Sequence, residues 1–348
     1  MRVLDLLHRW CGGILGLVLA VLGLTGAILV HKDDWIALPH AGDARVADPA
    51  MLGALAARLL EDARGGESLI FASDRFGLVQ GRTADGGFYA SQGGEIVERW
   101  SSQWDRPELW LFDLHHHLFA GETGEIVAGI AGLAVVLFTV TGAILWWRTR
   151  RTFAPRAWPR RLSGPAIRMH HRDLGIVAAP LLLLVAVTGT AMIFKPVGDW
   201  LFAPLSPPGT IRAELAPPAL PSAPLGRPDW AAIVRTAHAA FPDAELRILA
   251  LPRKPGEPIT LRMKRAGEWL PNGRSMLWFD AADGRLLGQR DALAMQPATQ
   301  AFNLLYPLHA AKVGGLPYRL VMTLTGIALA MLGLLATWSF WLRPRKQN

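Results

Sequence analysis

Four histidines stand beside long apolar segments, in two matched pairs. The first pair opens "HRWCGGILGLVLAVLGLTG" at His8 and "HRDLGIVAAPLLLLVAVTG" at His171, and in both segments a Thr-Gly pair follows, with its Thr 17 residues after the His. The second pair stands in "LHHHLFAG" (His115) and "LHAAKVGG" (His309), with a glycine six residues after the first His. Imidazole is a good ligand for iron. Two matched pairs predict the axial ligands of two haems.

A single histidine at a membrane boundary has another ordinary interpretation, because it can hydrogen-bond lipid headgroups. Small residues share the helical face of His8, and a similar set follows His171: Gly12, Gly16, Ala20 and Gly23 in the first segment, and Gly175, Ala178, Ala179, Ala186 and Gly189 in the second. Such a stripe admits a flat macrocycle, but close packing of two helices needs the same residues. The shared register of the two segments favours the ligand interpretation.

The composition is that of an integral membrane protein. Of 348 residues, 51% are apolar, and the mean hydropathy is +0.25. Four segments contain no Asp, Glu, Lys or Arg: Trp10–Val30, Ile126–Trp147, Leu174–Phe194 and Leu320–Leu342. Each has roughly the 20 residues that a helix needs to cross a bilayer. Lipid cannot satisfy exposed backbone groups, so we expect an all-α transmembrane core of four helices in the lipid bilayer.

Arginines indicate the orientation. Eight of them lie between the second and third segments: Arg148, Arg150, Arg151, Arg156, Arg160, Arg161, Arg168 and Arg172. Arg2 and Arg9 lie near the start of the sequence, and Arg343, Arg345 and Lys346 lie near its end. The positive-inside rule therefore places both termini in the cytoplasm of a multi-pass protein of a bacterial inner membrane. The net charge of +8 reflects this topology. We expect no nucleic-acid partner, because no aromatic residues are ordered around the basic loop for base stacking.

The remaining segments carry two α+β patterns in the same order. Residues 50–64 have helical apolar spacing and precede four short strand candidates, "SLIFASD", "FGLVQGR", "GGFYAS" and "GEIVERW". A second helix pattern begins at Asp229 and precedes "ELRILAL", "PITLRMK", "SMLWFDA" and "RLLGQRD". The chain thus reads as two copies of span, external domain and span. The only cysteine, Cys11, lies in the first span, so no disulfide supports the external domains.

These observations divide the chain into seven parts. They are the N-terminus and first span (1–31), the first periplasmic α+β domain (32–114), an interfacial segment with the second span (115–147), a basic cytoplasmic loop (148–172), the third span (173–194), the second periplasmic α+β domain (195–308), and an interfacial segment with the fourth span and cytoplasmic tail (309–348).

Other histidines compete as ligands. Three consecutive residues on a helix point about 100° apart and cannot all bind one ion, so we expect His115 to point inward and His116 and His117 to serve other roles. His31 at the external end of the first span, His117 and His170 are the less favoured alternatives. We find no HExxH, CxxC, Walker loop or suitable G-x-S-x-G, and we expect no buried carboxylates of the kind a proton-coupled carrier needs.

The four spans are similar to those of the PepSY-associated transmembrane family, which includes iron-regulated inner-membrane proteins and ferric-siderophore reductases. The resemblance rests on "LHRWCGGILGL", "DLHHHLFAGETGEIVAGIAGL", "HHRDLGIVAAPLLLL" and "LHAAKVGGLPYRLVMTLTG". The external domains resemble PepSY domains, notably around "LWFDAADGRLLG". The resemblance implies two b-type haems held by His8, His115, His171 and His309, and reduction of a periplasmic ferric-siderophore.

The sequence therefore predicts a di-haem enzyme that moves electrons across the membrane to a ferric-siderophore and releases Fe(II). The electron donor, a quinol or a cytoplasmic reductant, stays open. Two alternatives also stay open. One is a haem-dependent quinol oxidoreductase with another periplasmic acceptor. The other is a non-enzymatic protein whose PepSY domains bind a partner peptide or protease, with structural histidines.

Overall fold

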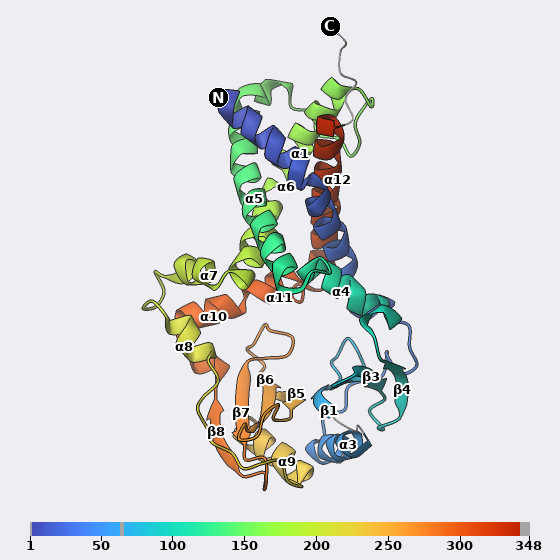
Figure 1. The fold of residues 1–348 in the computed structure, drawn as a ribbon, viewed down its shortest axis with the longest axis vertical. Helices are drawn as coiled ribbons and strands as arrows, with labels where there is room; N and C mark the ends of the chain where they lie inside the picture. Colours follow the sequence, from blue (N-terminus) through green and yellow to red (C-terminus); the bar gives the residue numbers. More distant parts are fainter. Residues whose placement is uncertain (1, 63–65, 342–348) are drawn as a thin grey trace. The chain divides into compact units, whose positions relative to one another are not determined.

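A computed structural model describes residues 2–62 and 66–341, which form two compact units (Figure 1). The helical unit contains the chain up to His31, Trp110–Leu201 and the chain from Leu305 onwards. The sheet unit contains Lys32–Leu109 and Phe202–Leu304. Five features predicted above lie outside the described residues: Arg343, Arg345, Lys346, the last residue of the fourth predicted span, and positions 63–64 of the first external helix.

Four long helices build the helical unit: α1 (Arg2–Leu29), α5 (Gly121–Thr149), α6 (Gly164–Ile193) and α12 (Gly315–Trp341). All four are long and apolar enough to cross a membrane. The helix α6 begins ten residues before its predicted span, with Pro165 in its first turn, where the missing N–H costs nothing. The predicted loop 148–172 is therefore shorter. It consists of the turn η2 (Arg150–Thr152) and an irregular segment that ends at Ser163.

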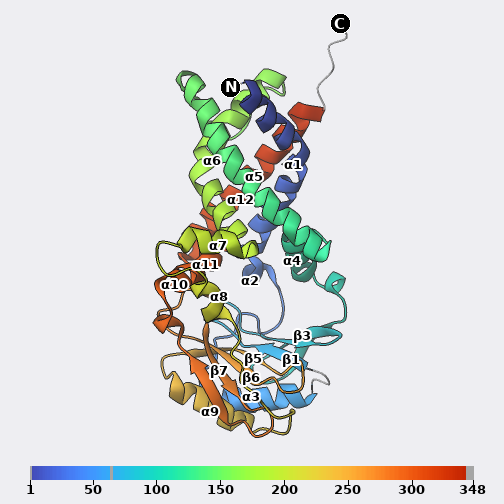
Figure 2. The same ribbon diagram turned by 60° about the vertical axis from the view of Figure 1, so that its left-hand side comes forward.

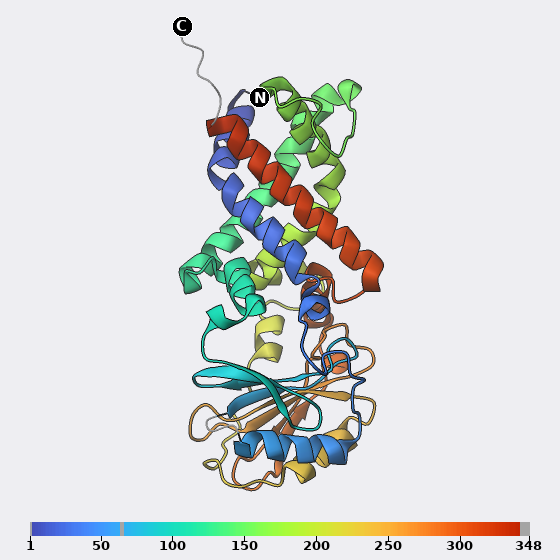
Figure 3. The ribbon, with the colours of Figure 1, turned by 90° about the vertical axis from the view of Figure 1, so that its right-hand side faces the viewer.

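Each long helix contacts two of the other three, so that the contacts form a closed ring of four helices. The helix α1 packs on α12 and α5 packs on α6, while α1 also meets α5 and α6 meets α12. Figure 3 shows α1 (blue) crossing α12 (red), and the two helices are in contact. A Cβ added at Gly23 would lie 2.5 Å from the carbonyl oxygen of Gly326, and one added at Gly16 would lie 2.5 Å from that of Gly333. Much of the small-residue stripe on α1 therefore serves helix packing.

Short helices precede α5 and α12. They are α4 (Pro107–His117) and α11 (Leu305–His309). Each ends in a tight turn with positive φ angles, at Leu118 and Phe119 after α4 and at Ala311 and Gly314 after α11. The fold thus places a short helix ending in histidine before each of these two spans. A further short helix, α7 (Lys195–Phe202), follows α6.

The sheet unit contains one antiparallel sheet of eight strands in the order β4-β3-β2-β1-β5-β6-β7-β8. The strands are β1 (Gly66–Ile70), β2 (Val79–Thr83), β3 (Gly86–Ala90), β4 (Ile96–Trp100), β5 (Glu245–Ala250), β6 (Ile259–Lys264), β7 (Ser275–Phe279) and β8 (Leu286–Arg290). All eight fall on predicted strands. The helices α3 (Pro49–Asp62) and α9 (Trp230–Ala240) lie along one face of this sheet (Figure 2). The remaining short helices of the unit are α2 (Lys32–Trp35), α8 (Thr210–Leu215) and α10 (Pro297–Asn303).

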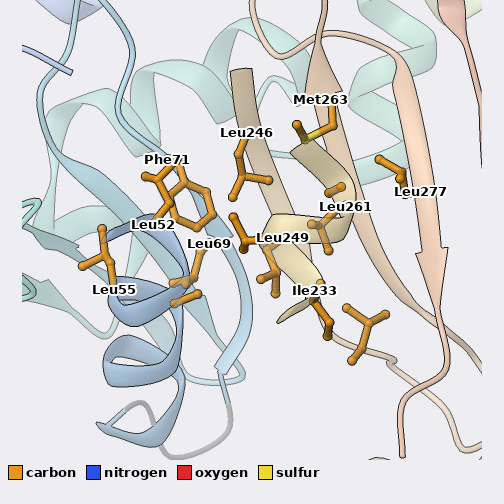
Figure 4. Packing of buried hydrophobic residues seen from close by; sticks show 14 of the residues in the cluster. Leu52, Leu55, Leu69, Phe71, Ile233, Leu246, Leu249, Leu261, Met263 and Leu277 are labelled. Carbon is orange, nitrogen blue, oxygen red and sulfur yellow. The ribbon is translucent and has the colours of Figure 1, made fainter. Parts of the chain in front are cut away.

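The two external segments do not form two separate domains, which corrects the expected division. The first strands of both repeats, β1 and β5, pair at the centre of the sheet, with Leu69 opposite Leu249. One hydrophobic cluster draws on both repeats, and Figure 4 shows side chains from α3, β1, α9 and β5 packed together. The two helices also touch, since a Cβ added at Gly53 would lie 2.6 Å from the Cα of Ala231. The repeats share one core because neither buries its sheet edge alone.

The close contact of α1 with α12 gives a testable prediction. We expect Gly23→Ala to lower the free energy of unfolding by about 1–3 kcal/mol, because its methyl group meets backbone atoms that cannot move aside. The matched change Gly12→Ala places its Cβ 3.8 Å from Ala336, so it should be neutral or slightly stabilising. Denaturant unfolding in detergent measures both. Equal effects of the two changes would contradict the packing role of Gly23.

Candidate functional site: two histidine pairs in the helical unit

The first histidine pair joins α1 to α6. The ring centres of His8 and His171 lie 6.3 Å apart, and the rings are almost perpendicular, at 88°. Nδ1 of His8 lies 2.8 Å from the hydroxyl oxygen of Thr141 on α5, and the Phe138 ring packs 5.2 Å from its centre. Nδ1 of His171 is buried and has no hydrogen-bond partner among the described residues. This pair lies at the end of the helical unit that carries the α5–α6 connection, hereafter the loop end.

The second pair lies at the opposite end, and its histidines belong to the short helices. The ring centres of His115 on α4 and His309 on α11 are also 6.3 Å apart, with the rings inclined at 49°. Nδ1 of His115 lies 3.0 Å from the hydroxyl of Thr25 on α1. Nδ1 of His309 lies 3.1 Å from the hydroxyl of Thr188 on α6. The structure therefore brings the four predicted histidines together as two pairs.

Three threonine hydroxyls determine which imidazole nitrogen carries the proton. Those of Thr25, Thr141 and Thr188 each donate to the carbonyl oxygen four residues earlier, at 2.7 Å. A hydroxyl has one proton to donate, so towards the histidine each can only accept. Nδ1 of the three contacted rings must then be the N–H donor, which leaves the Nε2 lone pair free. Metal-binding histidines are held in this manner by a second hydrogen bond.

The glycine after each of these threonines gives the ring its space. A Cβ added at Gly26 would lie 3.0 Å from Cε1 of His115, and one at Gly189 would lie 2.9 Å from Cε1 of His309. At Gly142 the corresponding distance to His8 is 3.6 Å. The Thr-Gly motif is thus a seat for a histidine from another helix. The sequence shows the motif but not its partner.

The 17-residue spacing also has a structural meaning. It corresponds to about 26 Å along a helix, so one helix reaches both histidine pairs. The helix α1 supplies His8 to the pair at the loop end and Thr25 to the pair at the opposite end. The helix α6 does the same with His171 and Thr188.

The separation within each pair fits one metal ion between two imidazoles. A ring nitrogen lies about 2.0 Å from a bound metal and about 1.1 Å from its own ring centre, so two rings on opposite sides of one ion have centres about 6.2 Å apart. Both observed separations are 6.3 Å. Among the described residues, no group of three or more His, Cys, Asp or Glu could hold a metal ion. Two protein ligands suit an iron whose other ligands come from a macrocycle.

A cavity adjoins the His8–His171 pair. Its volume is about 780 Å³, within the range of small-molecule and cofactor pockets, roughly 300–1,000 Å³. Gly12, Gly16 and Gly175 line it alongside apolar side chains such as Leu182 and Leu332. A Cβ added at Gly12 or Gly175 would have its nearest neighbour at 3.8 or 3.9 Å, so a flat ligand has room to approach the helix backbone there, whereas Gly16 packs against Gly333. The cavity, the spacing of the rings and the unpartnered Nδ1 of His171 together fit a bis-histidine haem.

Burial keeps both histidines of the second pair in the neutral form. It lowers the pKa of His115 to about 3, and it lowers that of His309 to about 4. Both rings are therefore neutral at physiological pH. The neutral form is the one that can bind a metal.

The other candidate histidines have different partners. His116 stacks on Phe112, with ring centres 4.1 Å apart, and Nδ1 of His117 lies 3.0 Å from the carboxylate of Asp113.

Two further candidates lie on long helices or at their ends. Nε2 of His31 lies 2.8 Å from the hydroxyl of Thr323. His170 is buried, and its Nε2 lies 3.3 Å from the sulfur of Met331. In neither contact is the partner another histidine, so neither His31 nor His170 forms a histidine pair through it.

A carboxylate of α6 is buried beside its counter-ion. Asp173 on α6 is almost fully buried, with 1% of its surface exposed. It forms an ion pair with Arg172, at 2.6 Å, and accepts a hydrogen bond from the backbone N–H of Ala154. This buried pair ties the start of α6 to the segment that follows α5. The hydropathy of the sequence does not show that Asp173 is buried, because two adjacent charged residues resemble an exposed segment.

Comparison with known proteins decides the family. The model of the PepSY-associated TM region matches residues 6–343. The chain belongs to this family. The PepSY-associated chain is thus a multi-pass membrane protein, with four apolar helices and an antiparallel sheet. It is 28% identical over 246 residues to an uncharacterized protein of Pseudomonas aeruginosa, a match that covers 64% of this chain and 58% of that protein. The matched region therefore spans less than two thirds of the relative's length.

The seat of His309 gives a prediction that needs no bound ligand. We expect Gly189→Ala to push the imidazole away and to loosen α11, because the new methyl group would meet Cε1. Gly142→Ala is the matched control, since its methyl group has room beside His8. Hydrogen-exchange mass spectrometry of the full chain should show faster exchange in Leu305–His309 only for the first variant. Unchanged exchange in α11 would contradict the claim that Gly189 makes room for the ring of His309.

Proposed function

We propose that the PepSY-associated chain is a haem-containing oxidoreductase that moves electrons across the inner membrane and reduces ferric-siderophore to release Fe(II). The observation that carries the proposal is the pair of bis-histidine arrangements, one at each end of the helical unit. Bound haem iron would supply a one-electron carrier with no open axial position, which favours electron transfer over oxygen chemistry. Both haems would be of b type, because the sequence contains no CxxC through which a haem could be attached.

The residues of this chain hold and shield the proposed redox sites. His8 and His171 would hold the haem at the loop end, and His115 and His309 would hold the haem at the opposite end. The hydroxyl oxygens of Thr25, Thr141 and Thr188 accept hydrogen bonds from Nδ1–H, which would leave the Nε2 lone pairs for a metal. The surrounding apolar helices exclude water, which otherwise would compete for the iron and solvate its charge.

Orientation follows from the arginines of the loop end. They lie on the cytoplasmic side under the positive-inside rule, which puts both termini there and the sheet unit in the periplasm. The His115–His309 pair is then the one nearer the periplasm, where a large hydrophilic chelate arrives. Electrons enter at the loop end from a quinol or a cytoplasmic reductant.

Reduction is a sensible way to release iron from a siderophore. Fe(III) is a harder ion than Fe(II) and binds charged oxygen ligands more tightly. One electron per ferric ion weakens the complex, and the chelator leaves unchanged. No bond of the chelator breaks, so the protein needs no acid, base or nucleophile at the point of transfer.

The first prediction of this proposal concerns haem content. We expect about two haems per wild-type chain by pyridine haemochrome assay, and about one after His8→Ala, His171→Ala, His115→Ala or His309→Ala, because each change removes one of two axial ligands. His116→Ala and His117→Ala are the matched controls and should keep both. Protein without haem after expression with ample haem would refute the proposal. Two haems in the His8/His171 double variant would refute the pairing.

The second prediction concerns the acceptor. We expect dithionite-reduced protein to reoxidise faster with a ferric-siderophore than in anaerobic buffer, with a ferrous trap drawing the reaction forward. His115→Ala or His309→Ala should abolish this step while the haem at the loop end can still be reduced. Stopped-flow absorbance measures it. If wild-type protein reoxidises no faster with the chelate than in buffer, the proposed reductase activity is refuted and another acceptor must be sought. Unimpaired His115 and His309 variants would refute only the site of transfer.

A further inference from the structure

The cavity beside His8 and His171 has a strongly basic rim. Four arginines line it, together with a single carboxylate, Asp5: they are Arg9, Arg148, Arg168 and Arg172. The rest of the lining is mostly apolar or small. A cavity with an apolar interior and a cationic rim fits a ligand that is flat and apolar at one edge and anionic at the other.

Two of these arginines already have anionic partners. Arg172 pairs with the buried carboxylate of Asp173 at 2.6 Å and donates to the carbonyl oxygen of Thr152. Arg9 lies 3.9 Å from Asp5. Within the described part of the chain, no carboxylate lies within 4 Å of Arg148 or Arg168. The rim therefore carries two guanidinium groups with no counter-charge.

The same two arginines stand in register with the histidine pair. Arg168 precedes His171 by three residues, close to one turn of α6 and on the same face. Arg148 follows Thr141, the partner of His8, by seven residues, which is two turns of α5. Both therefore lie on the loop-end side of the rings, one from each of two adjacent helices.

We propose that Arg148 and Arg168 bind the two propionate carboxylates of the haem held by His8 and His171. This inference rests on the proposed function. Two isolated carboxylates would be costly to bury in an apolar cavity, whereas guanidinium groups bind carboxylates through paired, charge-assisted hydrogen bonds. The haem then enters the cavity in one orientation, with its apolar edge between the helices and its anionic edge at the cytoplasmic rim.

Topology alone would explain the arginines differently, as part of the positive-inside signal. The connecting segment offers a control for that explanation. Arg156, Arg160 and Arg161 share the same loop end but do not line the cavity. If the charge matters only for topology, all of these arginines should be interchangeable. If it binds propionates, only the two at the rim should affect the haem.

The test compares two ligands that differ only in charge. Apoprotein of the full chain, in a His309→Ala background that leaves only the pair at the loop end, is titrated in detergent with ferric protoporphyrin IX or with its dimethyl ester. We expect the free acid to bind more tightly. Arg148→Gln and Arg168→Gln should each weaken the acid roughly ten- to hundredfold and leave the ester unchanged. Arg160→Gln should change neither.

A second readout separates binding from a general structural role. Removing a positive charge beside the haem should lower its midpoint potential, measured by redox titration, whereas Arg168→Lys should largely restore it. Equal affinity of wild type for acid and ester, or equal weakening of both in the variants, would overturn the inference and leave the haem proposal intact. A chain that binds neither ligand would overturn both.

Discussion

The helical unit depends on a small hydrogen-bond arrangement that recurs three times. A threonine hydroxyl donates its only proton to its own helix and so can meet a histidine only as an acceptor. Without that constraint, each imidazole could present either nitrogen, and its ring could rotate. With it, Nδ1 is occupied and the Nε2 lone pair stays free. Three of the four paired rings are held in this way, and the ring centres lie 6.3 Å apart in both pairs.

This arrangement makes the two sites interdependent. The helices α1 and α6 each provide a histidine at one end and a Thr-Gly seat at the other, so a change in the tilt of either helix affects both sites. The glycine contacts of α1 with α12, at Gly16 and Gly23, limit such tilting. The close packing and the site geometry thus depend on one another. The contacts repeat between the two halves of the chain, because α1 meets α5 as α6 meets α12.

Periodicity and composition revealed the four spanning helices and the eight strands, because both signals are local. Matched spacing singled out His8, His115, His171 and His309 among ten histidines. What the sequence could not show are contacts between distant segments: the meeting of Thr25 with His115, the pairing of β1 with β5, and the burial of Asp173 beside Arg172. The sequence also could not show where α6 starts. Arginines at a membrane boundary extend towards water and lower the local hydropathy, although their backbone is helical.

The pairing of β1 with β5 has a consequence for synthesis of the chain. Leu69 and its partner Leu249 are about 180 residues apart, and two membrane spans lie between them. At roughly 5–20 residues per second, the ribosome needs on the order of ten to forty seconds to supply the second strand. During that interval β1 presents an unpaired edge, which invites pairing with other chains. Biogenesis of this protein should therefore be sensitive to chaperones that cover strand edges on the side of the membrane where the sheet forms.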